Sequence, residues 1–529
     1  MKKKLFLVMI AVIMFVGALN VYALTTNDEV SPSDPNSKMI TDTATLTVQN
    51  VTEGDDFVAF KILDAYYNES TNVVSYEFTD DFNTFLEQSS TYQDFTVDDY
   101  FALTSGDITS GSTITTSTAD KLMSAYATYI IKLEESMATA TLMDVTGTTA
   151  TVTLQAGAYL VMQDQNTNGI YAVMLGNLDV TANNGEWVVN NETIVAKKSD
   201  VSFTFNVGDE SDVFAEDDIF GPLLSFSIGE KIPFKIIGQV PQFPTNAITK
   251  VYDFEIYYDD TIDLDEDLSS FVVTDGGTTL TTSPEGVVTD VSGNTVATIV
   301  IWNGPDYNIL AFEFNTDYLT SQEVTITGEV SLTEQALIGD ATGLRVKLTY
   351  SANSYNYDEH WANYLGFLRS EPVPIYTFGM NVLKYDIMDA TPLDTPLANA
   401  VFDIYSDSEL KNKVGSVTTG EDGIGTFNGL KYGTYYLKET KAPTGYQLLE
   451  DPIEVDVGSD RVDGDAGLPP SYSVATAYAP NRKMGLLPVT GSTGIILFTC
   501  IGVLIVGTGV GLLVSYKKKK KKEQNIEVI

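Results

Sequence analysis

Two apolar segments, one near each end of the 529-residue chain, limit which part of it can fold in water. The C-terminal segment, 494–516, has the roughly 20 residues that a helix needs to cross a bilayer, and six lysines follow it. Because positive charge stays on the cytoplasmic side, these lysines predict the orientation of a transmembrane helix. The N-terminal segment, 5–18, follows three lysines and precedes small residues, which is typical of a cleaved signal peptide over residues 1–23. The body between them is therefore expected to fold outside the cell.

Residue types that carry much of enzyme chemistry are nearly missing from this body. The one cysteine, Cys500, lies in the C-terminal apolar segment, so the exported part can form no disulfide. The one histidine, His360, leaves little for acid–base catalysis, and neither zinc binding nor thiol chemistry is expected. The chain has 72 acidic against 30 basic residues, which argues against nucleic acid and anionic membranes as partners. We predict no enzyme, no cofactor and no metal.

Strand-like runs dominate the body. They are rich in Val, Ile, Thr and aromatic residues, alternate with near period two, and are separated by Gly, Asn and Asp turn signals. This pattern predicts an all-β protein of tandem immunoglobulin-like β-sandwiches. The runs are 44–51, 149–162, 202–207, 296–302, 323–332, 344–350 and 434–440.

One helix is expected, at about 119–139, as an insertion in the first sandwich. Ser117 and Asp120 have capping-box spacing ahead of an apolar stripe. The stripe is predicted to pack into the core. It comprises Leu122, Tyr126, Tyr129, Ile130 and Leu133.

Two junctions divide the body. A cationic pair interrupts the acidic background within IVAKKSDVSF (194–203), and Pro372 and Pro374 favour an extended connector in EPVPIYTFG (371–379). We therefore expect domains at 24–196, 197–377 and 378–487, with a C-terminal segment at 487–529.

That segment opens with the motif LPVTG, directly ahead of the apolar run. With the helix and the lysines, it resembles the cell-wall sorting signal of Gram-positive bacteria, in which a sortase cleaves between Thr and Gly. Pro488 bends the chain and Gly491 permits close approach of an enzyme. The motif residues are Leu487, Pro488, Val489, Thr490 and Gly491.

A second resemblance covers the third domain. FGMNVLKYDIMDATPLDTPLANAVFDIY (378–405) and TTGEDGIGTFNGLKYGTYYLKETKAPTGYQLL (418–449) closely resemble the collagen-adhesin B-type domain. In that family a Lys on the first strand and an Asn on the last strand condense into an intramolecular isopeptide bond, assisted by an acidic residue on a central strand. The resemblance assigns these roles to Lys384, Asn481 and Glu439.

The chemistry explains why these residue types are needed. Burial lowers the pKa of a lysine and exposes the lone pair of its amine. Glu439 would polarise the Asn481 carbonyl and relay protons, and fixed geometry replaces a strong catalyst because the bond forms once per molecule. Alternation puts Lys384 on one face with Met380 and Val382, a face expected to be buried. The alternative is that Lys384 and Glu439 are surface residues of a solvated sheet.

The middle domain departs from this pattern. KKSDVSFTF (197–205), FSIGEKIPFKIIGQVP (226–241) and LRVKLTY (344–350) resemble the second domain of major pilin subunits, where Lys and Asn would be expected at about 203 and 344. This chain has Phe203 and Leu344. We predict no isopeptide bond at this pair.

The last motif is a candidate polymerisation lysine. In shaft pilins, a lysine near the end of the first domain attacks the acyl-enzyme formed at the Thr of the next subunit. WVVNNETIVAKK (187–198) is the matching region; Lys197 fits better and Lys198 is its neighbour, and the choice between them stays open. A basic linker pair is the alternative.

An acidic run, DDTIDLDEDLSS (259–270), has the initial spacing of a calcium loop at Asp263, Asp265 and Asp267. It lacks the Gly and the Glu that complete the loop, so a solvated loop is expected.

Together these features resemble the major shaft subunit of a sortase-assembled Gram-positive pilus. The resemblance implies a surface pilus anchored in the cell wall, with the precursor held in the plasma membrane. It implies as partners pilus-specific and housekeeping sortases, other copies of the chain, accessory pilins, peptidoglycan and host-surface ligands. The alternative is a monomeric or accessory wall-anchored adhesin, without a reactive lysine at the first junction.

Overall fold

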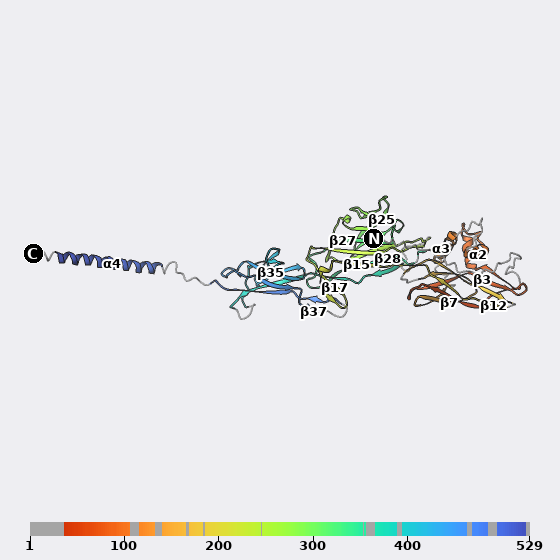
Figure 1. Cartoon of the computed structure of the whole chain (residues 1–529), viewed down its shortest axis with the longest axis horizontal. Helices are drawn as coiled ribbons and strands as arrows, with labels where there is room; N and C mark the ends of the chain where they lie inside the picture. The colour runs from red at the N-terminus through yellow and green to blue at the C-terminus, as the bar shows by residue number, and fades with distance from the viewer. Residues whose placement is uncertain are drawn as a thin grey trace, which may run out of the picture. The chain divides into compact units, whose positions relative to one another are not determined.

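The computed structural model describes residues 36–105, 116–132, 140–164, 169–183, 186–244, 246–352, 354–355, 365–388, 394–462, 468–484 and 495–524. The predicted signal peptide, His360 and the LPVTG motif lie outside these residues. The chain divides into two compact units, one holding 1–337 with 341–376 and the other 338–340 with 377–529. Strands dominate both units, which confirms the predicted all-β class (Figure 1).

The N-terminal part of the first unit holds four sheets whose strands pair among themselves. A six-stranded sheet is built around β3 and β8, a four-stranded sheet around β2 and β7, and two small sheets pair β11 with β12 and β14 with β9. The strands are β1 (Ser37–Met39), β2 (Thr43–Gln49), β3 (Phe57–Asn68), β4 (Val73–Phe78), β5 (Thr141–Leu142), β6 (Asp144–Thr146), β7 (Thr149–Gln155), β8 (Gly157–Gln163), β9 (Gly169–Tyr171), β10 (Met174–Leu178), β11 (Val180–Asn183), β12 (Glu186–Val189), β13 (Glu192–Val195) and β14 (Lys198–Asp200).

The run 149–162 is two strands rather than one. β7 and β8 belong to different sheets, and the chain turns between them at Gly157. Gly157 has φ of +140°, and a Cβ there would lie 2.0 Å from the carbonyl oxygen of Leu63. Only glycine meets both conditions, so the predicted single strand is wrong at this point.

Three helices, rather than one, pack on the six-stranded sheet: α1 (Asp80–Gln88), α2 (Val97–Ser105) and α3 (Thr116–Lys132) (Figure 1). α3 is the predicted helix, and its Leu122, Tyr126 and Ile130 are buried as expected.

The predicted cap of α3 is wrong, because the helix begins at Thr116 and so includes Ser117 and Asp120. Tyr129 is partly buried against the same core, and Leu133 lies outside the described residues.

Short length and aromatic content hid α1 from the sequence analysis. Thr79 caps it by accepting from the N–H of Phe82, two aspartates fill its first turn, and Phe82, Phe85 and Leu86 are buried at helical spacing.

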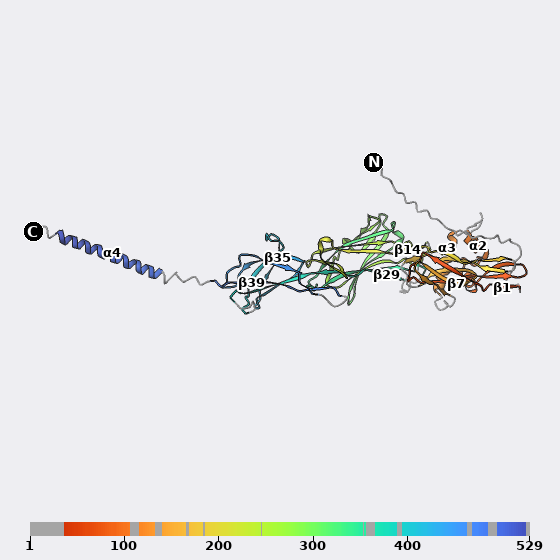
Figure 2. The same cartoon turned by 60° about the horizontal axis from the view of Figure 1, so that its bottom comes forward.

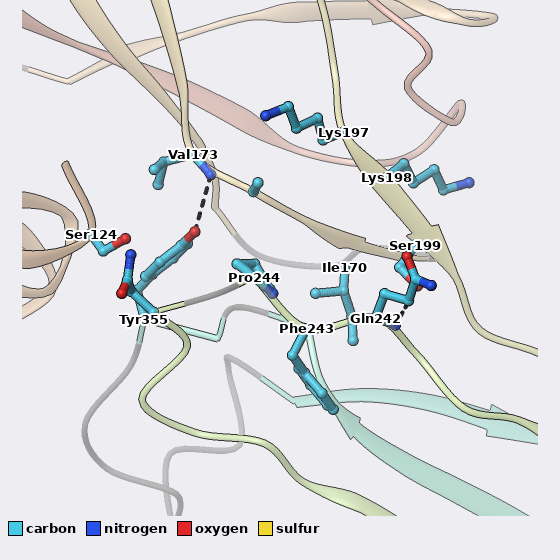
Figure 3. A pocket seen from close by; sticks show the side chains of 12 residues that line it. Ser124, Ile170, Val173, Lys197, Lys198, Ser199, Gln242, Phe243, Pro244 and Tyr355 are labelled. Carbon is cyan, nitrogen blue, oxygen red and sulfur yellow. Dashed lines mark hydrogen bonds between the residues drawn. The ribbon is translucent and has the colours of Figure 1, made fainter. Parts of the chain in front are cut away.

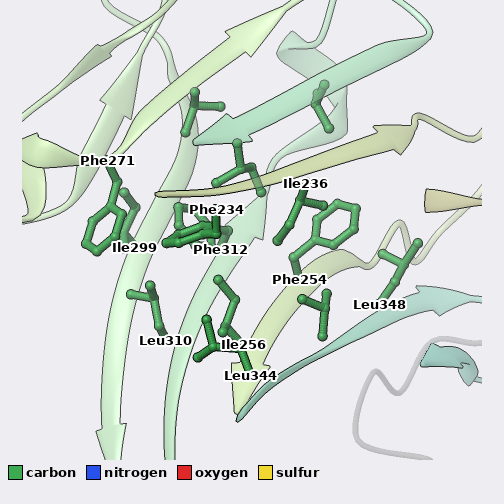
Figure 4. Packing of buried hydrophobic residues seen from close by; sticks show 14 of the residues in the cluster. Phe234, Ile236, Phe254, Ile256, Phe271, Ile299, Leu310, Phe312, Leu344 and Leu348 are labelled. Atoms are coloured by element: carbon green, nitrogen blue, oxygen red, sulfur yellow. The ribbon is translucent and has the colours of Figure 1, made fainter. Parts of the chain in front are cut away.

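The middle sheets of the first unit enclose its largest apolar cluster. Strands alternate buried and exposed residues, and side chains such as Phe254, Phe312 and Leu344 meet in one interior (Figure 4). The six-stranded sheet runs β15-β18-β27-β21-β22 with β20 on β27, and the ten-stranded sheet runs β16-β17-β30-β28-β19-β26-β25-β24-β23 with β29 on β28.

The elements are β15 (Phe203–Val207), β16 (Val213–Asp217), β17 (Gly221–Ser225), β18 (Lys231–Gln239), β19 (Tyr252–Tyr258), β20 (Ile262–Leu264), β21 (Val272–Asp275), β22 (Thr278–Thr279), β23 (Thr281–Thr282), β24 (Val287–Thr289), β25 (Thr295–Asn303), β26 (Asn308–Phe314), β27 (Glu323–Leu332), β28 (Thr342–Ser351), β29 (Leu365–Arg369) and β30 (Val373–Tyr376), with short 3-10 turns at Glu210–Asp212, Leu268–Ser270 and Thr316–Tyr318.

The second unit is a smaller sandwich. Its sheets run β34-β31-β39 and β33-β32-β35-β36, with a small β37-β38 pair. Its first and last long strands, β31 and β39, pair in parallel from Met380 opposite Ala475 to Asp386 opposite Asn481. The strands are β31 (Phe378–Asp386), β32 (Val401–Tyr405), β33 (Lys413–Thr418), β34 (Ile424–Leu430), β35 (Gly433–Lys441), β36 (Ile453–Val457), β37 (Arg461–Val462), β38 (Ser471–Tyr472) and β39 (Ala475–Asn481).

The C-terminal helix α4 (Ile495–Gln524) extends past the predicted end at Tyr516 into the lysine run, because lysine is a good helix former. Within it, Ile501–Lys520 is long and apolar enough to cross a membrane.

The middle core gives a first prediction. Phe312 is fully buried, so Phe312→Ala should lower the free energy of unfolding by about 3–5 kcal/mol, since it leaves a cavity between the sheets. Val291 is 96% exposed, and Val291→Ala should change it by less than about 0.5 kcal/mol. Urea unfolding followed by circular dichroism measures both. Equal effects of the two substitutions would contradict this packing.

Candidate functional site

Lys384 lies at the centre of the second unit, on the strand that the other two strands of its sheet flank. Its side chain is 0% exposed, as are neighbours on the same strand face such as Val382. The backbone around it is fixed on both sides, because its N–H donates to Gly423 O and its carbonyl accepts from Leu397 N. Gly423 has φ of +74°, and a Cβ there would lie 2.6 Å from Lys384 O, so glycine permits this close approach.

Glu439 on β35 and Asn481 on β39 meet Lys384 in the interior. Nζ of Lys384 lies 3.0 Å from Oε1 of Glu439, a distance typical of an ion pair, but without the angles of a hydrogen bond. Nδ2 of Asn481 donates to Oε1 of Glu439 at 3.2 Å. Glu439 and Asn481 are 1% and 2% exposed. The three side chains assigned from the sequence are therefore brought together, and the alternative of a solvated surface pair is wrong.

The surroundings act differently on the two charged groups. Burial lowers the pKa of Lys384 below its ordinary value of 10.5, while the carboxylate of Glu439 opposes that shift. Oε2 of Glu439 also accepts from Leu449 N at 2.7 Å, which fixes the carboxylate. Nζ lies 5.2 Å from the ring centroid of Phe402, so apolar surface completes its surroundings. An amine held beside an amide and a carboxylate in a dry interior can act as a nucleophile.

The residues just beyond this group were not singled out from the sequence. Asp386, two positions after Lys384, is 1% exposed, and its carboxylate contacts Tyr446 and Lys483. Period-two alternation places Asp386 on the same strand face as Lys384, which was expected to be buried. An acidic residue on that face was the sequence signal that could have identified it.

Lys197 and Lys198 differ sharply although they are adjacent. The Lys198 side chain is only 14% exposed; Nζ donates to Thr52 Oγ1 at 2.6 Å and pairs with Asp200 at 2.8 Å. Lys197 is exposed, and among the described residues its amine has no hydrogen bond or ion pair. The two side chains point in opposite directions from the backbone (Figure 3).

Both lysines line a pocket of about 240 Å³ within the first unit. Tyr355 closes one side of it, where its hydroxyl accepts from Val173 N at 3.3 Å (Figure 3). Gln242 N donates to Ser199 Oγ at 2.8 Å on another side. The pocket is therefore built from the last strand of the N-terminal sheets and from loops of the middle part.

Phe203 and Leu344 belong to the apolar core of the middle sheets. Leu344 is fully buried, and Phe203 packs with its ring 5.8 Å from that of Phe254. Of the lysines whose burial the structure describes, Lys384 alone is buried. The absence of a bond at 203 and 344 stays a prediction, which this apolar packing supports.

The acidic run 259–270 forms β20 and an exposed loop. Asp265 and Asp267 accept from the N–H groups of Asp267 and Ser269, so their oxygens stabilise the local turn. Over the described part of the chain, no group of three Asp, Glu, His or Cys side chains could hold a metal ion.

The fold is all-β and ends in an apolar helix, and comparisons with known proteins identify a wall anchor in this C-terminal part. Residues 381–466 match a prealbumin-like fold domain (SpaA), and residues 479–523 match the LPXTG cell wall anchor motif. These matches confirm the predicted anchor and the class of the C-terminal domain. The precursor is thus a surface protein of the cell wall that α4 holds in the membrane.

Relatives are pilus proteins. The chain is 34% identical over 87 residues to the fimbrial subunit type 1 of Actinomyces viscosus, covering 16% of this chain and 15% of that protein. It is 26% identical over 300 residues to the trypsin-resistant surface T6 protein of Streptococcus pyogenes serotype M6, covering 54% and 51%. The chain thus spans at most about half the length of these curated relatives.

The solved structure of the T6 backbone pilin of Streptococcus pyogenes serotype M6, described as modular and three-domain, has the same fold. It superposes with a TM-score of 0.61 and 18% identity over 84% of this chain and 99% of that one. The predicted resemblance to backbone pilins is confirmed for the fold.

The buried lysine gives a prediction on pH. In Asn481→Ala the amine cannot be consumed, and its folded pKa lies below the unfolded value near 10.5. Between the two pKa values the unfolded state binds more protons, so the free energy of unfolding should rise with pH across that window. At pH values below this window Lys384 is charged in the folded state, and the full cost of burying that charge lowers the free energy of unfolding.

The control is the double variant Lys384→Met/Asn481→Ala, which keeps every other titrating group. The free energy of unfolding of both variants is measured by urea unfolding at successive pH values. Their difference gives the contribution of Lys384 to the pH dependence. A difference that stays flat or falls as pH rises would contradict the lowered pKa.

Proposed function

We propose that this protein is the shaft-forming subunit of a covalently polymerised surface pilus. The observation that carries the proposal is the exposed amine of Lys197 at the end of the N-terminal sheets, which has no partner in the part of the chain that the structure describes. The same chain has the anchor motif and the fold of a backbone pilin. One chain then offers both an acyl donor and an acceptor. The protein would be a sortase substrate that is incorporated into the pilus shaft.

The proposed joining reaction runs in two steps. A sortase thiolate attacks the carbonyl of Thr490, the Thr490–Gly491 bond breaks, and Gly491 leaves as an amine that takes its proton from a general acid of the sortase. The neutral amine of Lys197 on another copy then attacks the thioester, an amide forms, the thiolate leaves, and the lysine releases a proton. The pocket beside Lys197 offers room for the incoming chain.

Lys198 serves instead as a structural cation in this proposal. Its amine contacts Thr52 and Asp200, and Nζ lies over the ring of Tyr171, 6.0 Å from the centroid. An ammonium held in this way is not free to reach an acyl-enzyme. It would fix the start of β14, next to Lys197.

Within the C-terminal domain we propose an intramolecular isopeptide bond between Lys384 and Asn481. The amine attacks the side-chain carbonyl of Asn481, a C–N bond forms, and the amide nitrogen leaves as ammonia with the protons that Glu439 relays. The buried ion pair at 3.0 Å and the Asn481 contact to Glu439 support this role for each residue. This is a single maturation step and not a turnover activity.

We propose three exported domains, 24–196, 197–377 and 378–487. The strand pairing supports this division except at the first boundary, where β14 (Lys198–Asp200) still pairs with β9 of the N-terminal group. The strands of β1–β14, β15–β30 and β31–β39 pair only within their own groups, in the part of the chain described. Partners in assembly would be pilus-specific and housekeeping sortases, further copies of this chain, accessory pilins and peptidoglycan. Host-surface ligands would be met by the assembled pilus, which supports adhesion.

The isopeptide bond is tested by mass. The mature wild-type chain should weigh one ammonia molecule less than its sequence, and Lys384→Ala, Asn481→Ala and Glu439→Ala should keep the full mass of their sequences. Intact mass spectrometry measures this directly. A wild-type chain at full sequence mass would overturn the proposed bond.

Polymerisation is tested with two charge-conserving variants, since a guanidinium is not a nucleophile at neutral pH. Denatured cell-wall extracts of wild type and Lys198→Arg should give a ladder of high-mass species on immunoblots. Lys197→Arg should give a single band at the subunit mass.

Two outcomes would contradict this assignment. A ladder lost only in Lys198→Arg would move the acceptor to the neighbouring lysine. A single band in every strain would sink the shaft proposal and favour a monomeric wall-anchored adhesin.

A further inference from the structure

Beyond Asn481 the last strand continues as a hydrogen-bonded extension. The carbonyl of Asn481 accepts from Ile387 N at 2.9 Å, and the carbonyl of Arg482 accepts from Gln447 N at 2.9 Å. Met484 N then donates to Gly445 O at 2.8 Å. Asn481 is thus hydrogen-bonded to the residue that follows β31, and Arg482 and Met484 are hydrogen-bonded to the loop that follows β35.

A buried carboxylate lies under this extension. Asp386 is 1% exposed, and its Oδ2 accepts from the hydroxyl of Tyr446 at 3.0 Å and pairs with Nζ of Lys483 at 2.9 Å. Its Oδ1 accepts from Met388 N at 3.0 Å. The N–H of Met388 and the ammonium of Lys483 hold the pKa of Asp386 below its usual range, so the carboxylate stays charged.

The register relates this group to the cross-linking residues. Asp386 is two positions past Lys384 and lies directly opposite Asn481 in the parallel pair β31–β39. Lys483 is two positions past Asn481. The Asp386–Lys483 ion pair therefore links the same two chain segments as Lys384 and Asn481, with each residue two positions further along.

We propose that Asp386, Tyr446 and Lys483 form a latch that positions Asn481 for condensation with Lys384. This rests on the isopeptide bond proposed above. β39 ends at Asn481, and strand ends fray unless they are tied down. The reaction needs the amine and the side-chain carbonyl at near-attack distance, and a small displacement slows such a step strongly.

The latch acts through Asn481 and exchanges no atom in the reaction. The new bond joins Nζ of Lys384 to the side-chain carbonyl carbon of Asn481, and ammonia leaves, whether the latch is present or not. Asp386, Tyr446 and Lys483 are thus positioning residues. Their loss should slow the bond without changing the product.

The experiment follows bond formation in the full chain by pulse labelling and intact mass, scoring the loss of ammonia against time. Lys483→Met removes the ion pair and should slow the reaction about fivefold. Lys483→Arg keeps the charge and should restore at least half of the wild-type rate. Tyr446→Phe keeps the ring, loses one hydrogen bond and should slow the reaction about twofold.

The matched control is Lys413→Met. Lys413 pairs with Asp403 at 2.8 Å in the same unit, but on β33 and β32, which do not pair with β39. Its rate should equal that of wild type. Thermal unfolding of Lys413→Met and Lys483→Met, each combined with Asn481→Ala, shows whether the two ion pairs contribute equally to stability.

The outcomes separate the latch from the bond itself. A wild-type chain that never loses ammonia refutes the isopeptide proposal. If the wild-type chain loses ammonia and both Lys483→Met and Tyr446→Phe lose it at the wild-type rate, the latch is refuted and the isopeptide bond is not. The latch is also refuted if Lys483→Arg is as slow as Lys483→Met, or if Lys413→Met slows the bond as much.

Discussion

The parallel pairing of β31 with β39 is the interaction on which the C-terminal unit depends. It joins strands about 100 residues apart in sequence, and such a contact must offset the loop-closure entropy of everything between them. A chain without cysteine in its exported body has no disulfide with which to reduce that entropy. A lysine and an asparagine on the two paired strands offer the same covalent closure without thiols, and tension along the chain would then bypass the strands between.

Burial of Lys384 makes sense in these terms. An ammonium in a dry interior is unfavourable even beside a carboxylate, and conversion to an amide removes the charge. The same residue type has the opposite setting at the end of the N-terminal sheets, where Lys197 is exposed. In the function proposed above, the enclosed lysine would react inside the chain, and the exposed one would react with another molecule. Both residues are lysines, so their surroundings determine which reaction each could undergo.

The middle sheets achieve their stability differently. Their core is broad and apolar, with Leu344 fully buried and Phe203 packed on Phe254 where a cross-link would otherwise lie. Apolar burial of this extent stabilises a domain without a covalent tie. The contrast explains why a reactive pair is expected in one domain and absent in another.

Sequence alone determined the all-β class, the membrane helix and the wall anchor, because alternation, composition and short motifs are local signals. The resemblance of the third domain to a known family assigned Lys384, Glu439 and Asn481. It did not show the turn at Gly157, the helix α1 or the latch at Asp386, since these depend on close approaches between distant segments. Nor could it choose between Lys197 and Lys198, which are adjacent and chemically identical. Only tertiary structure pairs Lys198 with Thr52 and Asp200 and leaves Lys197 exposed, because accessibility is a property of the fold rather than of the residue.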